Sequence, residues 1–291
     1  MKKLLLVLLL GWNSWAEASK TYVQTPVAAV RKTPDDKSEQ VTQALIGDEV
    51  QVLEQRKGWV KIFVKPQYRT EKGYPGWVHT QDLSTQPPPA EQPPVVVSSP
   101  EVWLRAKADP KAEILVRAPL GAQLVPVGPW PSQGWGCLWV PGLEEPVYAP
   151  VKHFSPAPPA PTSDGQKIVD TAWQLKGTRY LWGGMSNKGI DCSGFTYTAY
   201  RVHGILIPRD ADQQFLVGDP VKLADLQPGD LMFFGDTAEE ISHVGMYAGD
   251  GKFIHSSGSL GGVTITKIDH PKYTAIYQGA RRILGSSKTL P

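Results

Sequence analysis

Two proline-rich stretches constrain the fold of this chain more than any other feature of its sequence. Residues 86–94 read QPPPAEQPP, and residues 155–161 read SPAPPAP. Proline fixes its own φ angle and has no amide hydrogen to donate, so such stretches form extended, semi-rigid spacers. With 291 residues, the chain is also too long for one ordinary domain. We therefore expect three folded units, separated by two spacers.

The N-terminus has the pattern of a secretory signal peptide. Lys2 and Lys3 precede an apolar run at residues 4–10, and residues 16–18 form a small-x-small cleavage site. The run is too short to cross a bilayer, and no later stretch approaches the roughly 20 apolar residues of a membrane helix. We expect a signal peptide at residues 1–18, export to a periplasm or out of the cell, and no membrane attachment after cleavage.

Composition narrows the classes of partner. Lysine and arginine total 30 against 28 acidic residues, a net charge of +2 that points neither to nucleic acid nor to a membrane surface. The two cysteines, Cys137 and Cys192, fall in different predicted units, so we expect two free thiols. Cys137, in the run WGCLW, is expected to be a small buried hydrophobe. Cys192 needs a different explanation.

The part of the chain before the second spacer contains an internal repeat. Arg31 and Arg105 are 74 residues apart, as are Gly47 and Gly121, and each glycine leads into an apolar strand. Short β-rich runs such as WVKIFV at residues 59–64 favour strands over helices. The pattern predicts two copies of one small all-β unit.

From residue 163 onward the pattern changes to helices followed by antiparallel strands. A first helix is expected between an N-cap at Asp164 and a stop at Gly177, and a second from Asp191 or Cys192 to Gly204. Phe195, Ala199 and Val202 are expected on the inner face of the second helix. Strands are expected at residues 231–234, 243–248 and 252–255. Helices first and strands afterwards indicate an α+β domain.

Cys192 is placed for nucleophilic chemistry. At a helix N-terminus, free backbone N–H groups favour the thiolate and lower the pKa of the thiol. The sequence before it, YLWGG at residues 180–184, is rich in glycine and can leave the sulfur accessible.

Two histidines downstream could complete such a site. If residues 249–251 form a three-residue loop, Ala248 faces Lys252 and Gly245 faces His255. His243 and His255 then lie on one face as diagonal neighbours. His243 would take the thiol proton, and His255 would hold the imidazole in the correct tautomer.

Other interpretations of these residues remain open. Cys192 and the two histidines could ligate zinc, although no carboxylate or second thiolate completes the pattern. The histidines could also be core residues satisfied by hydrogen bonds. Asp230, in a Pro-Gly-Asp turn, is interpreted as a turn residue. The remaining histidines have no comparable context and are expected at surface or packing positions: His79, His153, His203 and His270.

Four motifs together resemble the NlpC/P60 family of cell-wall cysteine peptidases, in that family's order and spacing: DCSGF at 191–195, PGDL at 228–231, HVGMY at 243–247 and FIH at 253–255. The resemblance implies a papain-like α+β fold, a triad of Cys192, His243 and His255, and no metal or cofactor. It also implies cleavage between γ-D-glutamyl and a diamino acid in peptidoglycan stem peptides. Tyr180 and Trp182 match the family's Tyr-x-Trp-Gly-Gly segment, whose tyrosine lies beside the cysteine and is suited to bind an oxyanion.

The first repeat resembles the bacterial SH3 domain family, through VR at 30–31, LIG at 45–47, WVK at 59–61 and GWV at 76–78. The second repeat matches more weakly. Two such units ahead of this peptidase domain, together with PRDA at 208–211, resemble the dipeptidyl-peptidase branch of the family. That branch acts on free murein peptides with an N-terminal L-alanine. The resemblance assigns the substrate amine to Asp210, with Tyr74 of the first SH3-like unit and Ser193 as further contacts.

The sequence therefore predicts an α+β papain-like domain preceded by two small all-β SH3-like barrels. The expected parts are a signal peptide at 1–18, SH3-like units at 19–86 and 87–155, a spacer at 156–162 and the peptidase at 163–291. The leading hypothesis is release of L-Ala-D-Glu from free murein peptides. The alternatives are an endopeptidase of intact peptidoglycan with wall-binding SH3 units, and a non-catalytic peptidoglycan-binding protein.

Overall fold

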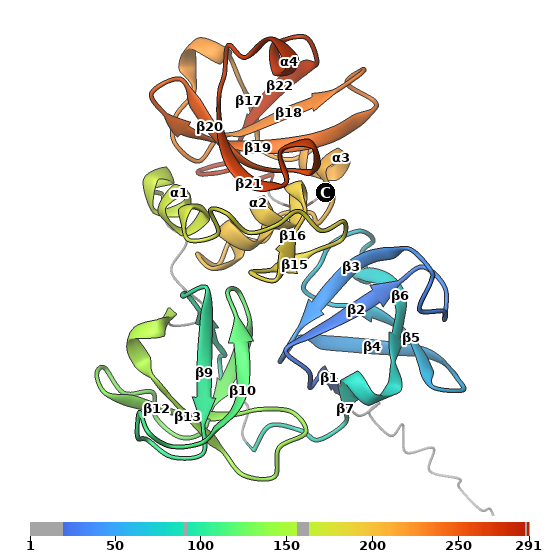
Figure 1. Cartoon of the computed structure of the whole chain (residues 1–291), viewed down its shortest axis with the longest axis vertical. Helices are drawn as coiled ribbons and strands as arrows, with labels where there is room; N and C mark the ends of the chain where they lie inside the picture. The colour runs from blue at the N-terminus through green and yellow to red at the C-terminus, as the bar shows by residue number, and fades with distance from the viewer. Residues whose placement is uncertain (1–19, 90–91, 156–162, 289, 291) are drawn as a thin grey trace, which may run out of the picture.

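The computed structural model describes residues 20–89, 92–155, 163–288 and 290. The expected signal peptide and the spacer at 156–162 lie outside the described residues. No helix in the described ranges is long and apolar enough to cross a membrane. Figure 1 shows three units that contact one another: two all-β units side by side, and a helix-and-sheet unit above them.

The first β unit consists of seven short strands. Their order in the sheet is β3-β2-β6-β5-β4-β1-β7, all pairs being antiparallel. A 3₁₀ turn, η1 (Thr80–Asp82), leads into the last strand. The strands are β1 (Thr21–Val23), β2 (Val27–Arg31), β3 (Gln40–Leu45), β4 (Glu49–Arg56), β5 (Trp59–Val64), β6 (Tyr74–His79) and β7 (Leu83–Ser84).

The second unit repeats this topology strand for strand, in the order β10-β9-β13-β12-β11-β8-β14. The guanidinium of Arg31 donates to the carbonyl of Ser38, and that of Arg105 donates to the carbonyl of Ala112, at the same offset of seven residues. The repeat seen in the sequence is therefore structural. The strands are β8 (Val95–Val97), β9 (Glu101–Arg105), β10 (Ile114–Pro119), β11 (Gln123–Pro126), β12 (Trp135–Trp139), β13 (Val147–Pro150) and β14 (Phe154–Ser155), with η2 (Val151–His153) before the last.

The third unit packs two helices against a six-stranded antiparallel sheet in the order β17-β22-β18-β19-β20-β21. Both predicted helices form: α1 (Gly165–Trp173), capped by Asp164, and α2 (Cys192–Arg201), capped by Asp191. The other elements are β15 (Met185–Ser186), β16 (Gly189–Ile190), α3 (Ala211–Gln214), β17 (Asp219–Val221), η3 (Leu223–Asp225), β18 (Leu231–Gly235), β19 (Ile241–Gly249), β20 (Lys252–Ser257), η4 (Gly258–Leu260), β21 (Gly262–Lys267), α4 (Pro271–Thr274) and β22 (Tyr277–Arg282).

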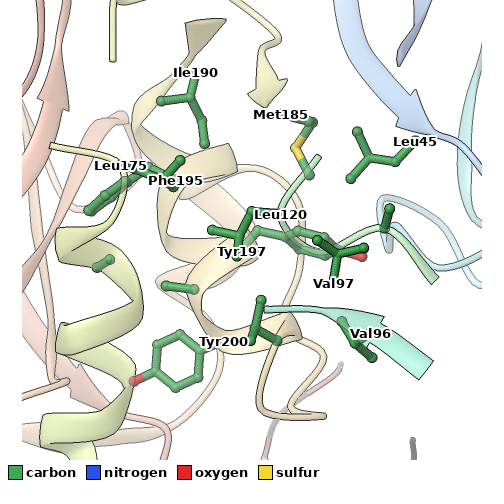
Figure 2. Close-up of a cluster of buried hydrophobic side chains, with 14 of the residues drawn as sticks. Leu45, Val96, Val97, Leu120, Leu175, Met185, Ile190, Phe195, Tyr197 and Tyr200 are labelled. Carbon is green, nitrogen blue, oxygen red and sulfur yellow. The ribbon is translucent and has the colours of Figure 1, made fainter. Parts of the chain in front are cut away.

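Helix α2 is buried over its whole length, not on the single inner face that its spacing predicts. The sheet covers one side of the helix, and the two β units cover the other (Figure 1). One apolar cluster joins the three units, including Leu45 of the first, Leu120 of the second and Tyr197 of α2 (Figure 2). A Cβ atom at Gly47 would collide with the carbonyl oxygen of Gln123, which shows how closely the β units approach each other.

A buried ion pair joins the first β unit to α2. The guanidinium of Arg201 donates to Asp48 Oδ1, and the exposed fractions of the two side chains are 1% and 0%. The other carboxylate oxygen of Asp48 accepts the backbone N–H of Leu45. Burial of both charges means that neither can be solvated if the other is removed.

The β19–β20 hairpin differs from the expected three-residue loop. Gly249 pairs with Lys252, so the turn contains only Asp250 and Gly251, both with positive φ, and Ala248 is left as a bulge. The expected pairing of Ala248 with Lys252 is therefore wrong. An Asp-Gly pair adopts the two-residue turn that matches strand twist, and the bulge absorbs the extra residue. Beyond the bulge, Met246 pairs with Ile254, so the register at the histidines is the one expected.

Cys137 also differs from expectation, since it is only partly buried on β12. Its cross-strand partner is Tyr148. Side chains at successive positions of a strand point to opposite faces, and here Gly136 and Leu138 face the interior. Both Cys137 and Cys192 are free thiols.

The Arg201–Asp48 pair makes a testable contribution to stability. Arg201→Met should lower the free energy of unfolding by about 3–5 kcal/mol, because it leaves a buried, unpaired carboxylate. Asp48→Asn combined with Arg201→Met should lose clearly less, because no buried charge remains. Urea denaturation followed by fluorescence measures both. Equal losses in the single and double variants would contradict this account.

Candidate active site

Cys192 is the first residue of α2, and the preceding residue caps that helix. The side chain of Asp191 accepts the backbone N–H of Gly194 at 2.6 Å. Gly194 lies so close to the carbonyl of Gly184 that a Cβ atom there would clash with it. The local sequence thus fixes the helix start, and with it the position of the sulfur.

A buried guanidinium holds the cap in place. Arg209 donates to both carboxylate oxygens of Asp191, at 3.1 and 2.7 Å, and to the hydroxyl of Ser193 at 2.9 Å. Its Nε also donates to the hydroxyl of Thr42 on β3 of the first β unit, at 3.0 Å. The side chain of Arg209 is 1% exposed. Arg209 is therefore an internal structural cation and not a surface residue.

The pKa of the Cys192 thiol differs from the sequence expectation. Burial raises it to about 12, and the adjacent carboxylate of Asp191 adds to the rise. Hydrogen bonds from the backbone of Val244 and Ser193, and the charge of Arg209, act in the opposite direction but do not offset burial. The expected lowering by the helix terminus is outweighed, because a desolvated thiolate is costly.

His243 and His255 meet across the β19–β20 hairpin. Nε2 of His243 lies 2.8 Å from Nδ1 of His255, and Nε2 of His255 lies 2.9 Å from the hydroxyl of Thr266 on β21. A proton on Nε2 of His243 leaves its Nδ1 free to accept another. That tautomer requires the proton of His255 on Nε2, donated to Thr266.

Both imidazoles are held neutral by their surroundings. Burial lowers the pKa of His243 to about 4, and the charge of Lys272 contributes. Burial, His243 and Lys272 together lower the pKa of His255 to about 3. The rings pack against Tyr273 and Phe253. The thiol of Cys192 and both imidazoles are therefore neutral.

A cavity of about 370 Å³ opens in front of Cys192, between the first β unit and the third unit. Both units supply side chains to its wall. The first β unit contributes Glu39, Val41, Arg69 and Tyr74, and the third contributes Tyr180, Trp182, Asp191, Cys192, Ser193, Asp210, Ala211, Asp212, Ile241 and Ser242.

Asp210 and Tyr74 meet at this cavity although 136 residues separate them. The hydroxyl of Tyr74 donates to Asp210 Oδ2 at 3.0 Å. Asp210 occupies the N-cap position of α3 but makes no capping bond, so its carboxylate remains directed at other partners. Burial raises the pKa of Asp210, while Arg209, Arg69 and the Tyr74 hydroxyl act to keep the carboxylate ionised.

The other predicted site residues also line the cavity. Burial is the main cause that raises the pKa of Tyr180, and the carboxylate of Asp191 adds to it, so its phenol stays a proton donor. Trp182 is 60% exposed and donates its indole N–H to Glu39 at 3.1 Å. The hydroxyl of Ser193 already accepts a hydrogen bond from Arg209, which limits its availability to a ligand.

The structure adds residues that the sequence reasoning missed. Arg69 and Glu39 come from the first β unit and face the same cavity. Nothing in their local sequence marks them, because their position depends on how the units dock. Thr266 lies two residues from Thr264, the cross-strand partner of His255. The register of the strands could have identified Thr266 as a neighbour of His255.

The remaining histidines occupy packing or surface positions. His79 stacks on Trp59 and pairs with Asp36, while the imidazole of His270 caps α4. His153 and His203 hydrogen-bond hydroxyl groups, at Ser99 and Thr171. Within the described ranges, no group of three or more His, Cys, Asp and Glu side chains is arranged to hold a metal ion.

Comparisons with known proteins agree with this architecture. The NlpC/P60 family model matches residues 177–282, and the bacterial SH3 domain model matches residues 26–84. The chain is 35% identical over 262 residues to a γ-D-glutamyl-L-lysine dipeptidyl-peptidase of Bacillus cereus, covering 84% of this chain and 75% of the relative. A dipeptidyl-peptidase of the same name from Bacillus subtilis is 33% identical over 222 residues, which cover 74% of this chain and 71% of the relative.

A solved structure extends the similarity to the whole architecture. An NlpC/P60 family protein from Bacillus cereus ATCC 10987 superposes with a TM-score of 0.79 at 29% identity, over 91% of this chain and 100% of that one. The predicted fold class, a papain-like α+β domain after SH3-like β units, is confirmed.

Because the thiol of Cys192 is neutral, its rate of alkylation should depend on pH. The thiolate is the reactive form, so alkylation of Cys192 by iodoacetamide should rise about tenfold per pH unit between pH 7 and 10. The reason is that the pKa of the thiol, raised to about 12, lies above that range. Mass spectrometry of the Cys137→Ser variant isolates the reaction at Cys192. A plateau beginning below pH 7 would instead indicate a preformed thiolate–imidazolium pair.

Proposed function

The chain belongs to the NlpC/P60 family of peptide hydrolases, and on that premise we propose a specific activity for it. It is a cysteine peptidase that hydrolyses the γ-D-glutamyl–diamino acid bond of murein peptides bearing a free N-terminal L-alanine, and it releases L-Ala-D-Glu. The observation that carries the proposal is the Asp210 carboxylate, held by Tyr74 in the same cavity as Cys192. The relatives named above as dipeptidyl-peptidases support it.

The chemistry begins with Cys192. Its sulfur attacks the γ-carbonyl carbon of D-glutamate while its proton passes to the free ring nitrogen of His243. The negative charge that develops on the carbonyl oxygen is stabilised by the hydroxyl of Tyr180, which remains protonated. His255 supports the charged His243 through their 2.8 Å hydrogen bond.

The second half of the cycle reuses the same groups. The C–N bond breaks, and His243 gives its proton to the departing amine of the diamino acid, which leaves a thioester on Cys192. Water then attacks the thioester carbonyl while His243 takes a proton from it. The C–S bond breaks, and His243 passes that proton to the sulfur of Cys192 as the dipeptide is released. Protons and bonds balance over the two steps, and no cofactor enters either one.

The pocket beside Asp210 determines which peptides fit. A partly buried carboxylate in a cavity wall binds an ammonium ion and disfavours a neutral amide. Tyr74 and Arg69 of the first β unit stand beside Asp210, so a chain continuing beyond alanine would meet them. An alanine still linked to the glycan therefore fits poorly.

The first SH3-like unit has a role in the site, and the relatives bear on where the protein acts. The first unit forms part of the cavity wall, so it acts in substrate selection and not as a separate wall-binding module. The relatives indicate a cell-wall-associated or exported protein. We place its activity on soluble murein peptides in a periplasm or outside the cell.

The decisive comparison uses two tripeptides. L-Ala-γ-D-Glu-diaminopimelate should be cleaved rapidly, and the same peptide acetylated on its alanine should resist cleavage, because only the first carries the cation for Asp210. Liquid chromatography of the released dipeptide measures both rates. Equal rates would contradict the proposed amine pocket and indicate an endopeptidase that tolerates intact peptidoglycan. No cleavage of either, with a reactive Cys192, would favour a binding protein.

Asp210→Asn tests the same pocket from the protein side. It should lower kcat/KM for the free tripeptide by about 100-fold, because it removes one charge of a partly buried pair. Asp219→Asn, at an exposed position on β17, is the matched control and should leave kcat/KM unchanged. A small effect of Asp210→Asn on the free tripeptide would argue against the assigned contact.

Thr266→Val tests how the histidine pair is oriented. We expect kcat to fall about tenfold with KM unchanged, because His255 loses the acceptor that selects its tautomer. Thr264→Val, two residues earlier on the same face of β21, serves as the control. Rescue by Thr266→Ser would separate the hydroxyl from simple packing. A change in KM alone would contradict the positioning role.

A further inference from the structure

Arg69 makes an unusual double contact at the amine end of the cavity. Its Nη1 lies 2.9 Å from both carboxylate oxygens of Asp212 and 3.2 Å from Oδ2 of Asp210. That oxygen of Asp210 also accepts the hydroxyl of Tyr74 at 3.0 Å. One nitrogen of Arg69 therefore serves two carboxylates, and one of these is the proposed amine ligand.

The backbone of Arg69 is anchored while its guanidinium stays accessible. Its carbonyl accepts the side chain of Gln213 at 3.0 Å. The preceding residue, Tyr68, forms a bridge to Pro208, and its carbonyl accepts the backbone N–H of Arg209 at 3.0 Å. The side chain of Arg69 is nevertheless 38% exposed. It can shift between the two carboxylates without any movement of the chain.

The charged side chains around Asp210 carry one negative charge in excess. Arg209 lies 2.7 Å from Asp191 and is counted against it, although it also lies 3.9 Å from Oδ1 of Asp210. Glu39 across the cavity lies 3.7 Å from Lys32. The remaining group consists of Asp210, Asp212 and Arg69, with two negative charges and one positive. A ligand with a single positive charge completes the balance, and a neutral ligand does not.

We propose that Arg69 is a placeholder for the substrate's ammonium group. In the structure it shares its charge between Asp210 and Asp212. When a peptide with a free α-amine enters, the ammonium takes Asp210, and Arg69 remains on Asp212 alone. The proposal rests on the proposed function, since it assigns the selection of free amines partly to Arg69 and Asp212.

Arg69 in this position increases the discrimination between free and acetylated peptides beyond what Asp210 alone provides. An acetylated peptide brings no cation, so displacing Arg69 would take from Asp210 its nearer cation and leave only Arg209, 3.9 Å away. A free amine exchanges one cation for another at the same oxygen. Asp212 thus provides the second ion-pair partner of Arg69, and its charge determines how readily Arg69 leaves Asp210.

A double-mutant cycle tests this exchange. Binding of the free tripeptide to the full chain carrying Cys192→Ala is measured by calorimetry, so that catalysis does not interfere. Asp212→Asn should weaken binding about fivefold, the size expected for a half-exposed pair, because Arg69 then stays on Asp210. Arg69→Gln alone should tighten binding, since the competing cation is gone. Adding Arg69→Gln to Asp212→Asn should restore wild-type affinity.

The outcomes separate this inference from the proposed function. If the Asp212→Asn defect persists in the double variant, the aspartate acts only on the structure of α3, and the placeholder is wrong. If Asp212→Asn binds as tightly as wild type, the exchange is wrong as well. Both results leave the preference for free over acetylated tripeptide intact. Loss of that preference in the otherwise unmodified protein overturns the proposed function itself.

Discussion

The buried guanidinium of Arg209 is the interaction on which the site depends. It binds Asp191, which caps the helix that carries Cys192, and it reaches Thr42 in the first β unit. The next residue in the chain is Asp210. One side chain therefore fixes Cys192, Asp210 and the docking of the β unit relative to one another. Removing it would leave the carboxylate of Asp191 buried and uncompensated, at a large cost in stability.

This arrangement changes the role of the SH3-like units. The proline-rich stretches suggest units on separate tethers, yet Leu45 and Leu120 of the two β units share a core with Tyr197 of α2 (Figure 2). The first unit is rigidly placed, so Tyr74 and Arg69 can act as parts of the site. Residues that must hold a substrate to within fractions of an ångström require such support.

The three side chains proposed for catalysis are neutral in the structure. Burial raises the pKa of Cys192 and lowers those of His243 and His255, so these three side chains carry no charge at neutral pH. The hydrogen-bonded series from His243 through His255 to Thr266 orients the ring that receives the proton. A neutral pair avoids the desolvation cost of two buried ions until the substrate arrives.

Local sequence determined the elements that carry the chemistry. The cap at Asp191, the strand register at His243 and His255, and the family motifs all depend on residues close together in the chain. Tertiary structure decided the rest. The bulge at Ala248 follows from the two-residue turn at Asp250 and Gly251. This turn is favoured over other loop lengths by only a small free energy. The pKa of Cys192 follows from burial by distant segments. The pairing of Tyr74 with Asp210 spans 136 residues and depends on how two units dock, which no local pattern encodes.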